Sequence, residues 1–168
     1  MKLESFKEGL GSLWEDVAEG WRYLTQSAAG ALTRFRPGAT TKLPSQADVD
    51  DAFYLPTRSW AMLGGDVFED KDDLVVRLEL PGMEKQDIDI EVAGDNLVIS
   101  GEKRFEEEST EGRWRVMQCA YGAFRRVVPL PVPVQADKAS ATYQNGVLKL
   151  KLPKVTPGKP RSVTVKVD

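Results

Sequence analysis

The sequence contains no histidine, and Cys119 is its only cysteine. Without histidine, neither a Ser-His-Asp triad nor a Cys-His pair can form, and histidine zinc ligands are missing as well. A single thiol cannot build a thiolate zinc site or a disulfide within the chain, which favours a reducing compartment. No glycine-rich phosphate loop that ends in Lys-Ser or Lys-Thr occurs, so ATP hydrolysis has no recognisable site. We therefore expect no enzyme activity, no metal and no cofactor.

Long apolar runs are also missing from the sequence. Residues 1–4 introduce an acidic side chain early and no apolar core follows, so we expect no secretory signal peptide. No stretch of about 18 apolar residues exists, so we expect no membrane-spanning segment. These two expectations together predict a cytoplasmic location.

An excess of positive charge is absent too, since 23 Lys and Arg stand against 26 Asp and Glu. This balance argues against a general nucleic-acid binder, which needs a strongly basic surface. The charges are unevenly distributed, however. Residues 66–112 hold 16 acidic and 5 basic side chains, whereas residues 113–168 hold 11 basic and 2 acidic ones. Complementary stretches of this kind can pair within a fold or across a homo-oligomer.

Residues 1–25 carry large apolar side chains three or four positions apart, which predicts an amphipathic helix. Its polar face bears mainly carboxylates, which disfavours an anionic membrane surface. The helix could pack on its own domain, but a β-sandwich with filled inner faces leaves little apolar surface for it. We therefore favour an arm that contacts other polypeptide chains, whose candidate contact residues are Phe6, Leu10, Leu13, Trp14, Val17 and Trp21.

Residues 26–65 lose this pattern and are interrupted by Ser, Gly, Pro and Asp, which indicates a mobile linker. Together with the helix they form an expected variable N-terminal arm over residues 1–65. Aromatic and apolar residues are scattered through the linker, so we expect it to be adhesive in places.

From Asp66 onward the apolar period becomes two, as in half-buried strands. An Asn145-Gly146 pair between two alternating runs predicts a β-hairpin. Because no helical pattern intervenes, we predict an all-β fold, an antiparallel immunoglobulin-like β-sandwich over residues 66–154. Residues 155–168 form an expected C-terminal extension, which starts with a Pro/Gly spacer. It ends in a short β-prone run suited to adding to a sheet edge.

The long connection over residues 103–121 contains an alternating run, Arg113-Trp114-Arg115-Val116. An aromatic residue between arginines could stack on single-stranded nucleic acid. The glutamates at positions 106–108 would repel phosphate, so we favour a strand over a nucleic-acid site. A connection this long in a small sandwich is usually functional or disordered.

Two groups of carboxylates have simpler explanations than a metal or catalytic site. Residues 70–73 lack the glycine and the distal glutamate of a calcium loop, which favours a solvated turn. Asp87, Asp89 and Glu91 alternate with aliphatic residues, which favours the solvated face of a strand over a glycosidase acid pair.

Several short motifs follow one another in a fixed order. They are Leu80-Pro81-Gly82, Asn-Leu-Val-Ile-Ser-Gly-Glu at 96–102, Gly-Ala-Phe-Arg-Arg-Val-Val-Pro-Leu-Pro at 122–131, Ala-Thr-Tyr-Gln-Asn-Gly-Val-Leu at 141–148 and Leu-Pro-Lys at 152–154. In this order and spacing the set resembles the small heat-shock protein (α-crystallin domain) family. The long connection around Trp114 is similar to that of the bacterial and plant members.

The resemblance implies a dimer that assembles into larger homo-oligomers. A strand from the long connection would pair with an edge strand of the partner near Asp66, and Arg126 matches an arginine of the family's interface. A buried arginine needs a partner, so an acidic residue should face it, although a plain surface charge is the alternative. The implied interface residues are Arg113, Trp114, Arg115, Val116, Arg126, Asp66, Val67 and Phe68.

The resemblance also implies that the C-terminal extension docks into a groove on another subunit. The family's Ile-x-Ile anchor is matched by Val163 and Val165, or in an overlapping register by Val165 and Val167. Valine removes a methylene group from each anchor, which costs about 0.5–1.5 kcal/mol by analogy with core Ile→Val changes. The implied groove residues are Ile88, Ile90, Val92, Ala139, Ala141 and Tyr143.

The function implied is that of an ATP-independent holdase chaperone, which binds partly unfolded proteins and prevents their aggregation under heat or other stress. Its partners would be further copies of itself, unfolding clients and the ATP-dependent chaperones that receive those clients. A monomeric p23-like co-chaperone is an alternative, and a carboxylate-dependent hydrolase is a weaker one. The anchor and the loop strand have a use only in an assembly, which favours the holdase.

Overall fold

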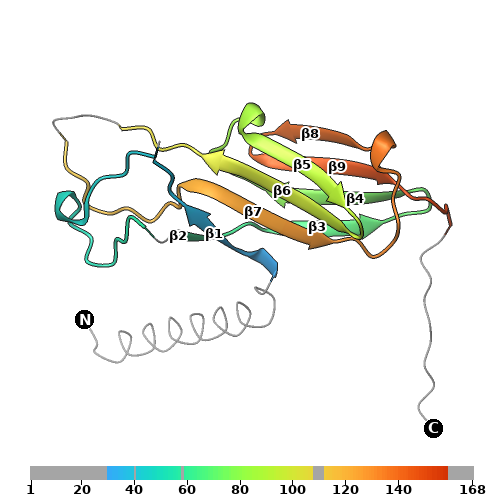
Figure 1. Ribbon diagram of the computed structural model, residues 1–168, viewed down its shortest axis with the longest axis horizontal. Coiled ribbons are helices and arrows are strands. Elements are labelled where there is room, and N and C mark those ends of the chain that lie inside the picture. Colours follow the sequence, from blue (N-terminus) through green and yellow to red (C-terminus); the bar gives the residue numbers. More distant parts are fainter. Residues whose placement is uncertain (1–29, 40, 58, 108–111, 159–168) are drawn as a thin grey trace, which may run out of the picture.

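A computed structural model describes residues 30–39, 41–57, 59–107 and 112–158 of the chain (Figure 1). Nine strands and three short 3-10 helices follow one another in these ranges. The strands are β1 Leu32–Arg36, β2 Ser59–Met62, β3 Gly65–Glu69, β4 Asp73–Glu79, β5 Ile88–Ala93, β6 Asn96–Lys103, β7 Gly122–Pro129, β8 Ser140–Gln144 and β9 Val147–Pro153. The 3-10 helices are η1 Gln46–Asp48, η2 Lys85–Asp87 and η3 Ala136–Lys138.

The strands form two antiparallel sheets, which Figure 1 shows stacked as two layers. One sheet has the order β2-β1-β7-β6-β5 and the other the order β3-β4-β9-β8. The predicted all-β antiparallel sandwich is therefore confirmed. Because side chains alternate across a strand, each sheet turns one apolar face inward.

The core lies between the sheets and consists mainly of alternating aliphatic side chains. On β4, Leu74, Val76 and Leu78 are buried, while Arg77 and Glu79 between and beyond them are exposed. Fully burying one leucine-sized side chain contributes about 1.5–3 kcal/mol, so this alternation fixes which face of each strand turns inward. The same rule selects the core residues of β6, β7 and β9, which include Leu97, Ile99, Phe124, Val128, Leu148, Leu150 and Leu152.

The β8–β9 hairpin turns at the predicted Asn-Gly pair. Asn145 has a φ of 52° and Gly146 a φ of 76°. Both values lie in the left-handed region, as a type I′ hairpin turn requires, and asparagine and glycine adopt it at the lowest cost. The register is then set by the turn, with Gln144 opposite Val147 and Tyr143 opposite Leu148.

The two sides of the sandwich differ in how they end. On one side the chain runs from β2 in the first sheet to β3 in the second through Leu63 and Gly64, so it crosses between the layers. Leu63 is buried there, and its N–H donates to the carbonyl oxygen of Ala31 at 2.9 Å. On the other side the sheets end in the separate edge strands β5 and β8. The chain also crosses between the sheets from β4 to β5 and from β7 to β8, but only on the first side are the two edge strands consecutive in the chain; we call the other side the open side.

The structure differs from the expected linker at residues 26–65. Two strands lie within it, because β1 pairs with both β2 and β7 and so extends the sheet of the sandwich. The reason is Phe35, which is 2% exposed and packs against Phe124 with ring centroids 5.3 Å apart. One inward aromatic residue is enough to hold a short strand, although flanking Gly and Pro residues suggest a loop.

Candidate interaction sites at the sheet edges

Strand β3 is an edge strand whose only partner in the described part of the chain is β4. Its outward face carries Asp66 and Phe68, and Phe68 is 63% exposed. Val67 belongs to the inward face opposite Val76, yet it is still 42% exposed because no strand lies beyond it. The predicted residues Asp66, Val67 and Phe68 therefore lie together on an unpaired edge.

A surface cavity of about 580 Å³ opens beside this edge. Val67, Phe68 and Val75 provide apolar contacts, and charged side chains surround them. A shallow apolar depression with a charged rim is suited to the side chains of another polypeptide rather than to a chemical reaction. The residues lining the cavity are Asp66, Val67, Phe68, Val75, Arg77 and Lys149.

The predicted loop strand at positions 113–116 lies elsewhere in the same chain. Trp114 forms an isolated parallel bridge with Val49, and the N–H of Asp50 donates to the carbonyl oxygen of Trp114 at 2.9 Å. The structure therefore separates the predicted interface set within one chain. The loop residues lie beside Val49, whereas Asp66, Val67 and Phe68 pair only with β4.

Arg126 lies on β7 opposite Ile99, in the register of inward-facing residues, and is partly buried. Its Nε atom is buried and has no hydrogen-bond partner within the described residues. Burial lowers the pKa of the guanidinium. The acidic residue that the sequence led us to expect opposite Nε is therefore not supplied by the described part of this chain. A buried arginine in this state requires a partner group to offset its desolvation.

The six predicted groove residues divide between the two edge strands on the open side. On β5, Ile88, Ile90 and Val92 share the face that turns to the core, and Ile90 remains 38% exposed. On the other sheet, Ala139 precedes β8, while Ala141 and Tyr143 lie two residues apart within it. These residues present partly exposed apolar side chains on unpaired strand edges.

Tyr143 connects the two edges through its hydroxyl group. The oxygen lies 2.7 Å from the carbonyl oxygen of Leu80 and 3.0 Å from that of Met83. Both carbonyls belong to the segment that leads from β4 to β5, so the hydroxyl ties β8 to the entrance of β5. This contact holds the spacing between the two edge strands on the open side.

The start of the C-terminal extension is fixed by Lys154, which is only 4% exposed. Its ammonium group donates to Glu69 Oε1 at 2.7 Å and to the carbonyl oxygens of Asp70 at 3.0 Å and Gly158 at 2.6 Å. Gly158 in turn donates its N–H to the carbonyl oxygen of Lys71 at 2.7 Å. All three ammonium protons are thus used, as a buried charge requires.

Sequence reasoning missed this role for Lys154, because two of its three acceptors, Glu69 at the end of β3 and Asp70 in the turn after it, are distant in sequence. The anchor residues Val163, Val165 and Val167 lie outside the described residues, as do the arm residues Phe6, Leu10, Leu13, Trp14, Val17 and Trp21.

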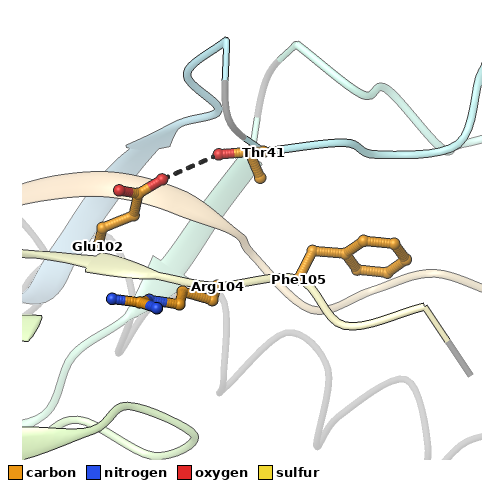
Figure 2. A pocket seen from close by; sticks show the side chains of 4 residues that line it. All are labelled: Thr41, Glu102, Arg104 and Phe105. Carbon is orange, nitrogen blue, oxygen red and sulfur yellow. Dashed lines mark hydrogen bonds between the residues drawn. The ribbon is translucent and has the colours of Figure 1, made fainter.

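A further cavity of about 360 Å³ lies where residue 41 of the arm meets the end of β6 (Figure 2). Thr41 Oγ1 donates to Glu102 Oε1 at 3.1 Å, and Arg104 and Phe105 complete the lining. The hydroxyl is bonded to a carboxylate that is already engaged, without a histidine to relay a proton. The contact therefore fastens the arm to β6 and offers no activated nucleophile.

Metal-binding clusters and membrane-spanning helices are both absent from the described ranges. These ranges contain no group of three or more His, Cys, Asp or Glu side chains able to hold a metal ion. No helix in them is long and apolar enough to cross a membrane. Cys119 is a free, exposed thiol.

Comparison with known proteins gives consistent matches. The model of the Hsp20/alpha crystallin family matches residues 66–167. Heat shock protein 16 of Schizosaccharomyces pombe is 40% identical over 92 residues, which are 54% of this chain and 64% of that protein. The 17.6 kDa class I heat shock protein 1 of Arabidopsis thaliana is 31% identical over 132 residues, covering 74% of this chain and 85% of the relative.

Among solved structures, heat shock protein 16.0 from Schizosaccharomyces pombe superposes with a TM-score of 0.54 at 36% identity. The alignment covers 62% of this chain and 97% of that one. The match to the yeast protein thus extends over the sandwich, and this chain spans less than two thirds of the full yeast sequence.

Proposed function

The chain belongs to the Hsp20/alpha crystallin family, and from this premise we propose that it is a small heat-shock chaperone. In this proposal it holds partly unfolded proteins without ATP and keeps them from aggregating under heat or other stress. A catalytic role is not part of the proposal.

The observation that carries the proposal is the pair of unpaired sheet edges with exposed apolar side chains. Phe68 is 63% exposed at the β3 edge, and Ile90 is 38% exposed at the β5 edge. Unpaired backbone groups beside apolar side chains are able to bind other extended chains by strand addition. Exposed edges of this kind support both self-assembly and the capture of unfolded segments.

We propose that the β3 edge of one subunit receives residues 113–116 of a second copy. The cavity beside β3 offers Phe68 and Val75 to an incoming aromatic side chain such as Trp114. The acidic half of the sandwich and the basic half that follows it in sequence favour such an exchange electrostatically. Arg126, whose Nε has no partner in the described residues, would find its acidic partner in this assembled state.

We propose further that Val163 and Val165, or Val165 and Val167, dock beside Ile88, Ile90 and Val92 of β5 and Ala139, Ala141 and Tyr143 around β8. Support comes from the position of these edge strands on the open side and from the fixed exit of the extension at Lys154. Weak contacts of this type gain strength when many subunits repeat them.

We also propose a role for each segment of the chain and a cellular location for the protein. Residues 1–65 act as a variable arm whose helix over residues 1–25 contacts clients, residues 66–154 form the α-crystallin domain, and residues 155–168 form the extension. The protein works in the cytoplasm and passes its clients to ATP-dependent chaperones.

The decisive experiment heats an aggregation-prone client with and without the protein, in the absence of ATP, and follows light scattering. We expect that about one subunit per client molecule is enough to suppress the scattering. Static light scattering of the protein alone is expected to give a mass of many subunits. A monomer that leaves client aggregation unchanged would overturn the proposal.

A further inference from the structure

A second apolar cluster lies outside the main core and joins two distant chain segments. Val49, Tyr54 and Met117 are its buried members at 6%, 7% and 9% exposure. One segment, residues 41–57, runs between β1 and β2, and the other, described over residues 104–107 and 112–121, belongs to the connection between β6 and β7. Partly buried residues that pack on the cluster are Leu43, Phe105, Trp114 and Tyr121.

Figure 1 shows these two segments lying together beyond one end of the sandwich. We call this pair of segments the lobe. Because its interior is buried and its two segments leave the sandwich at neighbouring strands, the lobe is a packed unit and not a free loop. It is also tied to the end of β6 through Thr41 and Glu102.

Asp50 fastens the two segments of the lobe electrostatically. Its Oδ1 atom accepts a hydrogen bond from Arg113 Nε at 2.7 Å and lies 2.5 Å from Arg113 Nη2, and its Oδ2 atom pairs with Arg115 Nη1. The hydrogen bond from Arg113 is the largest cause that lowers the pKa of the Asp50 carboxyl. Each carboxylate oxygen thus contacts a different arginine, and charge-assisted hydrogen bonds of this kind are stronger than neutral ones.

The backbone of the lobe leaves one edge of the loop strand open. Trp114 directs its carbonyl oxygen toward Asp50. Successive residues of an extended strand direct their N–H and C=O groups to opposite edges. The backbone groups of Arg113, the residue before the isolated bridge at Trp114, therefore face away from Asp50, while the chain bends at Arg115.

Three large apolar side chains of the lobe, among them Leu55 at 51%, are exposed in the described chain. Phe53 is 92% exposed and Val116 is 58% exposed. Large apolar side chains this open are typical of contact surfaces when they gather on one unit. They lie on the same lobe as the open strand edge, so a single partner can cover all of these features.

We propose that the lobe docks as one body on a second copy of this chain, with residues 49–50 preorganising the loop strand and Phe53 adding a contact of its own. The inference rests on the proposed strand exchange and deepens it. In this proposal two segments contact the partner together. The loop around Trp114 reaches the partner's β3, and the arm segment 41–57 accompanies it. Asp50 is a positioning residue that acts through Arg113 and Arg115.

Preorganisation of the loop lowers the conformational-entropy cost of docking on the partner. A loop segment that is already bonded in place at Trp114, Arg113 and Arg115 loses less conformational freedom when it pairs with β3. The partner edge carries Asp66, and the lobe's two arginines remain 56% and 78% exposed at their side chains, so their outer faces are open to it. The second copy is thus complementary to the lobe in backbone, charge and apolar surface.

The first test compares Asp50→Asn with Asp48→Asn in the full chain. Asp48 lies in the same segment, hydrogen-bonds to Ser45 and acts on Arg113 only as a nearby charge, so it controls for the loss of a carboxylate without the loss of the direct contacts to the loop. Hydrogen exchange measures protection of the amides at 113–116, and mixing of light and heavy isotope-labelled subunits followed by native mass spectrometry measures subunit exchange. We expect Asp50→Asn to speed both processes about tenfold and Asp48→Asn to leave them unchanged. Equal rates of hydrogen exchange and of subunit exchange in the two variants would overturn the role of Asp50 as a positioning residue.

The second test uses Phe53→Ser, which cannot disturb the interior of the subunit because the side chain is almost fully exposed. Val127→Ser on β7, with an exposed side chain outside the lobe, is its control. We expect only Phe53→Ser to accelerate subunit exchange, by several-fold. Identical rates for Phe53→Ser and the unaltered protein would exclude contact of the arm segment with a partner.

A third measurement separates failure of this inference from failure of the strand exchange beneath it. In a Cys119→Ser background, Val67→Cys and Val116→Cys are combined and oxidised. A disulfide between chains supports strand exchange whatever Asp50 does. If no such disulfide forms while Asp50→Asn still loosens the loop, strand exchange is wrong and the docking of the lobe on β3 falls with it.

Discussion

At the scale of single residues, Lys154 shows how a fold can place a charge in its interior at a tolerable cost. The ammonium group has three acceptors, and its carboxylate partner Glu69 is 19% exposed at the side chain. The neighbouring pair Lys151–Asp73 has a similar length of 2.9 Å, but its lysine is 59% exposed. Removing one member of a buried pair leaves the other unpaired, whereas an exposed pair contributes little.

We therefore predict that Lys154→Met lowers the free energy of unfolding by about 2–3 kcal/mol, because Glu69 loses its partner. Lys151→Met is predicted to change it by no more than about 1 kcal/mol. Urea denaturation followed by circular dichroism measures both. Similar losses of unfolding free energy in the two variants would show that the buried Lys154 pair contributes no more to stability than the exposed Lys151 pair.

Asp50 leads to a prediction about acid. Its pKa is lowered from 3.8 in the folded chain, so its contribution is present above pH 3.8 and is lost as the pH falls through the folded value. We predict that amide protection factors at 113–116 stay constant from pH 7 to about pH 4 and decline below it. The Asp50→Asn variant should lack this acid transition. A decline already near pH 6 would point to another group.

At the scale of elements, sequence reasoning succeeded where a strand has an alternating core face. Strands β4, β5, β6, β7, β8 and β9 all fall within predicted alternating runs. It failed for β1 and β2, because only Phe35 of β1 enters the main core deeply and no local pattern distinguishes it. Pairing of β1 with β7 is a tertiary contact, and such contacts override local propensity.

The same limit applies to the candidate site. The edge strand near Asp66 and the groove residues on β5 and β8 followed from the family resemblance. The contacts of Asp50, Lys154 and Tyr143 did not, since each joins residues separated by 60 or more positions in the sequence, apart from the link of Lys154 to Gly158. Side chains that join distant loops follow no sequence period, so their contacts could be identified only from the three-dimensional structure.

Tyr143 allows the open side to be tested as an element. We predict that Tyr143→Phe costs about 1 kcal/mol, because it removes the hydroxyl that binds the carbonyl oxygens of Leu80 and Met83. Hydrogen exchange in β5 and β8 should increase locally, with little change in β4. Thermal unfolding and residue-resolved exchange measure these effects. A uniform change across both sheets would argue against a local link between the edges.

At the scale of the whole molecule, the sandwich has one side on which the edge strands β2 and β3 are consecutive in the chain, and an open side. The proposed anchor docks on the open side of another subunit. Loss of the anchor should therefore affect assembly more than folding. We predict that deletion of residues 163–168 leaves the unfolding temperature of the sandwich nearly unchanged and shifts the assembly to smaller species. Light scattering and native mass spectrometry measure the sizes. An unchanged size distribution would contradict anchoring by the extension.

Lys154 also places a geometric limit on the architecture of any assembly built through the extension. Gly158, the last described point of the extension, is held by Lys154 and Lys71, so its position is fixed by the sandwich. An extended chain covers about 3.4 Å per residue, and position 163 is five residues further on, which gives a tether of about 17 Å. The accepting edge of a neighbour must lie within that radius of Gly158, or within about 24 Å if Val165 is the first anchor. The spacing between subunits is thus bounded by a tether whose origin is fixed in the fold and whose length is fixed by the number of residues.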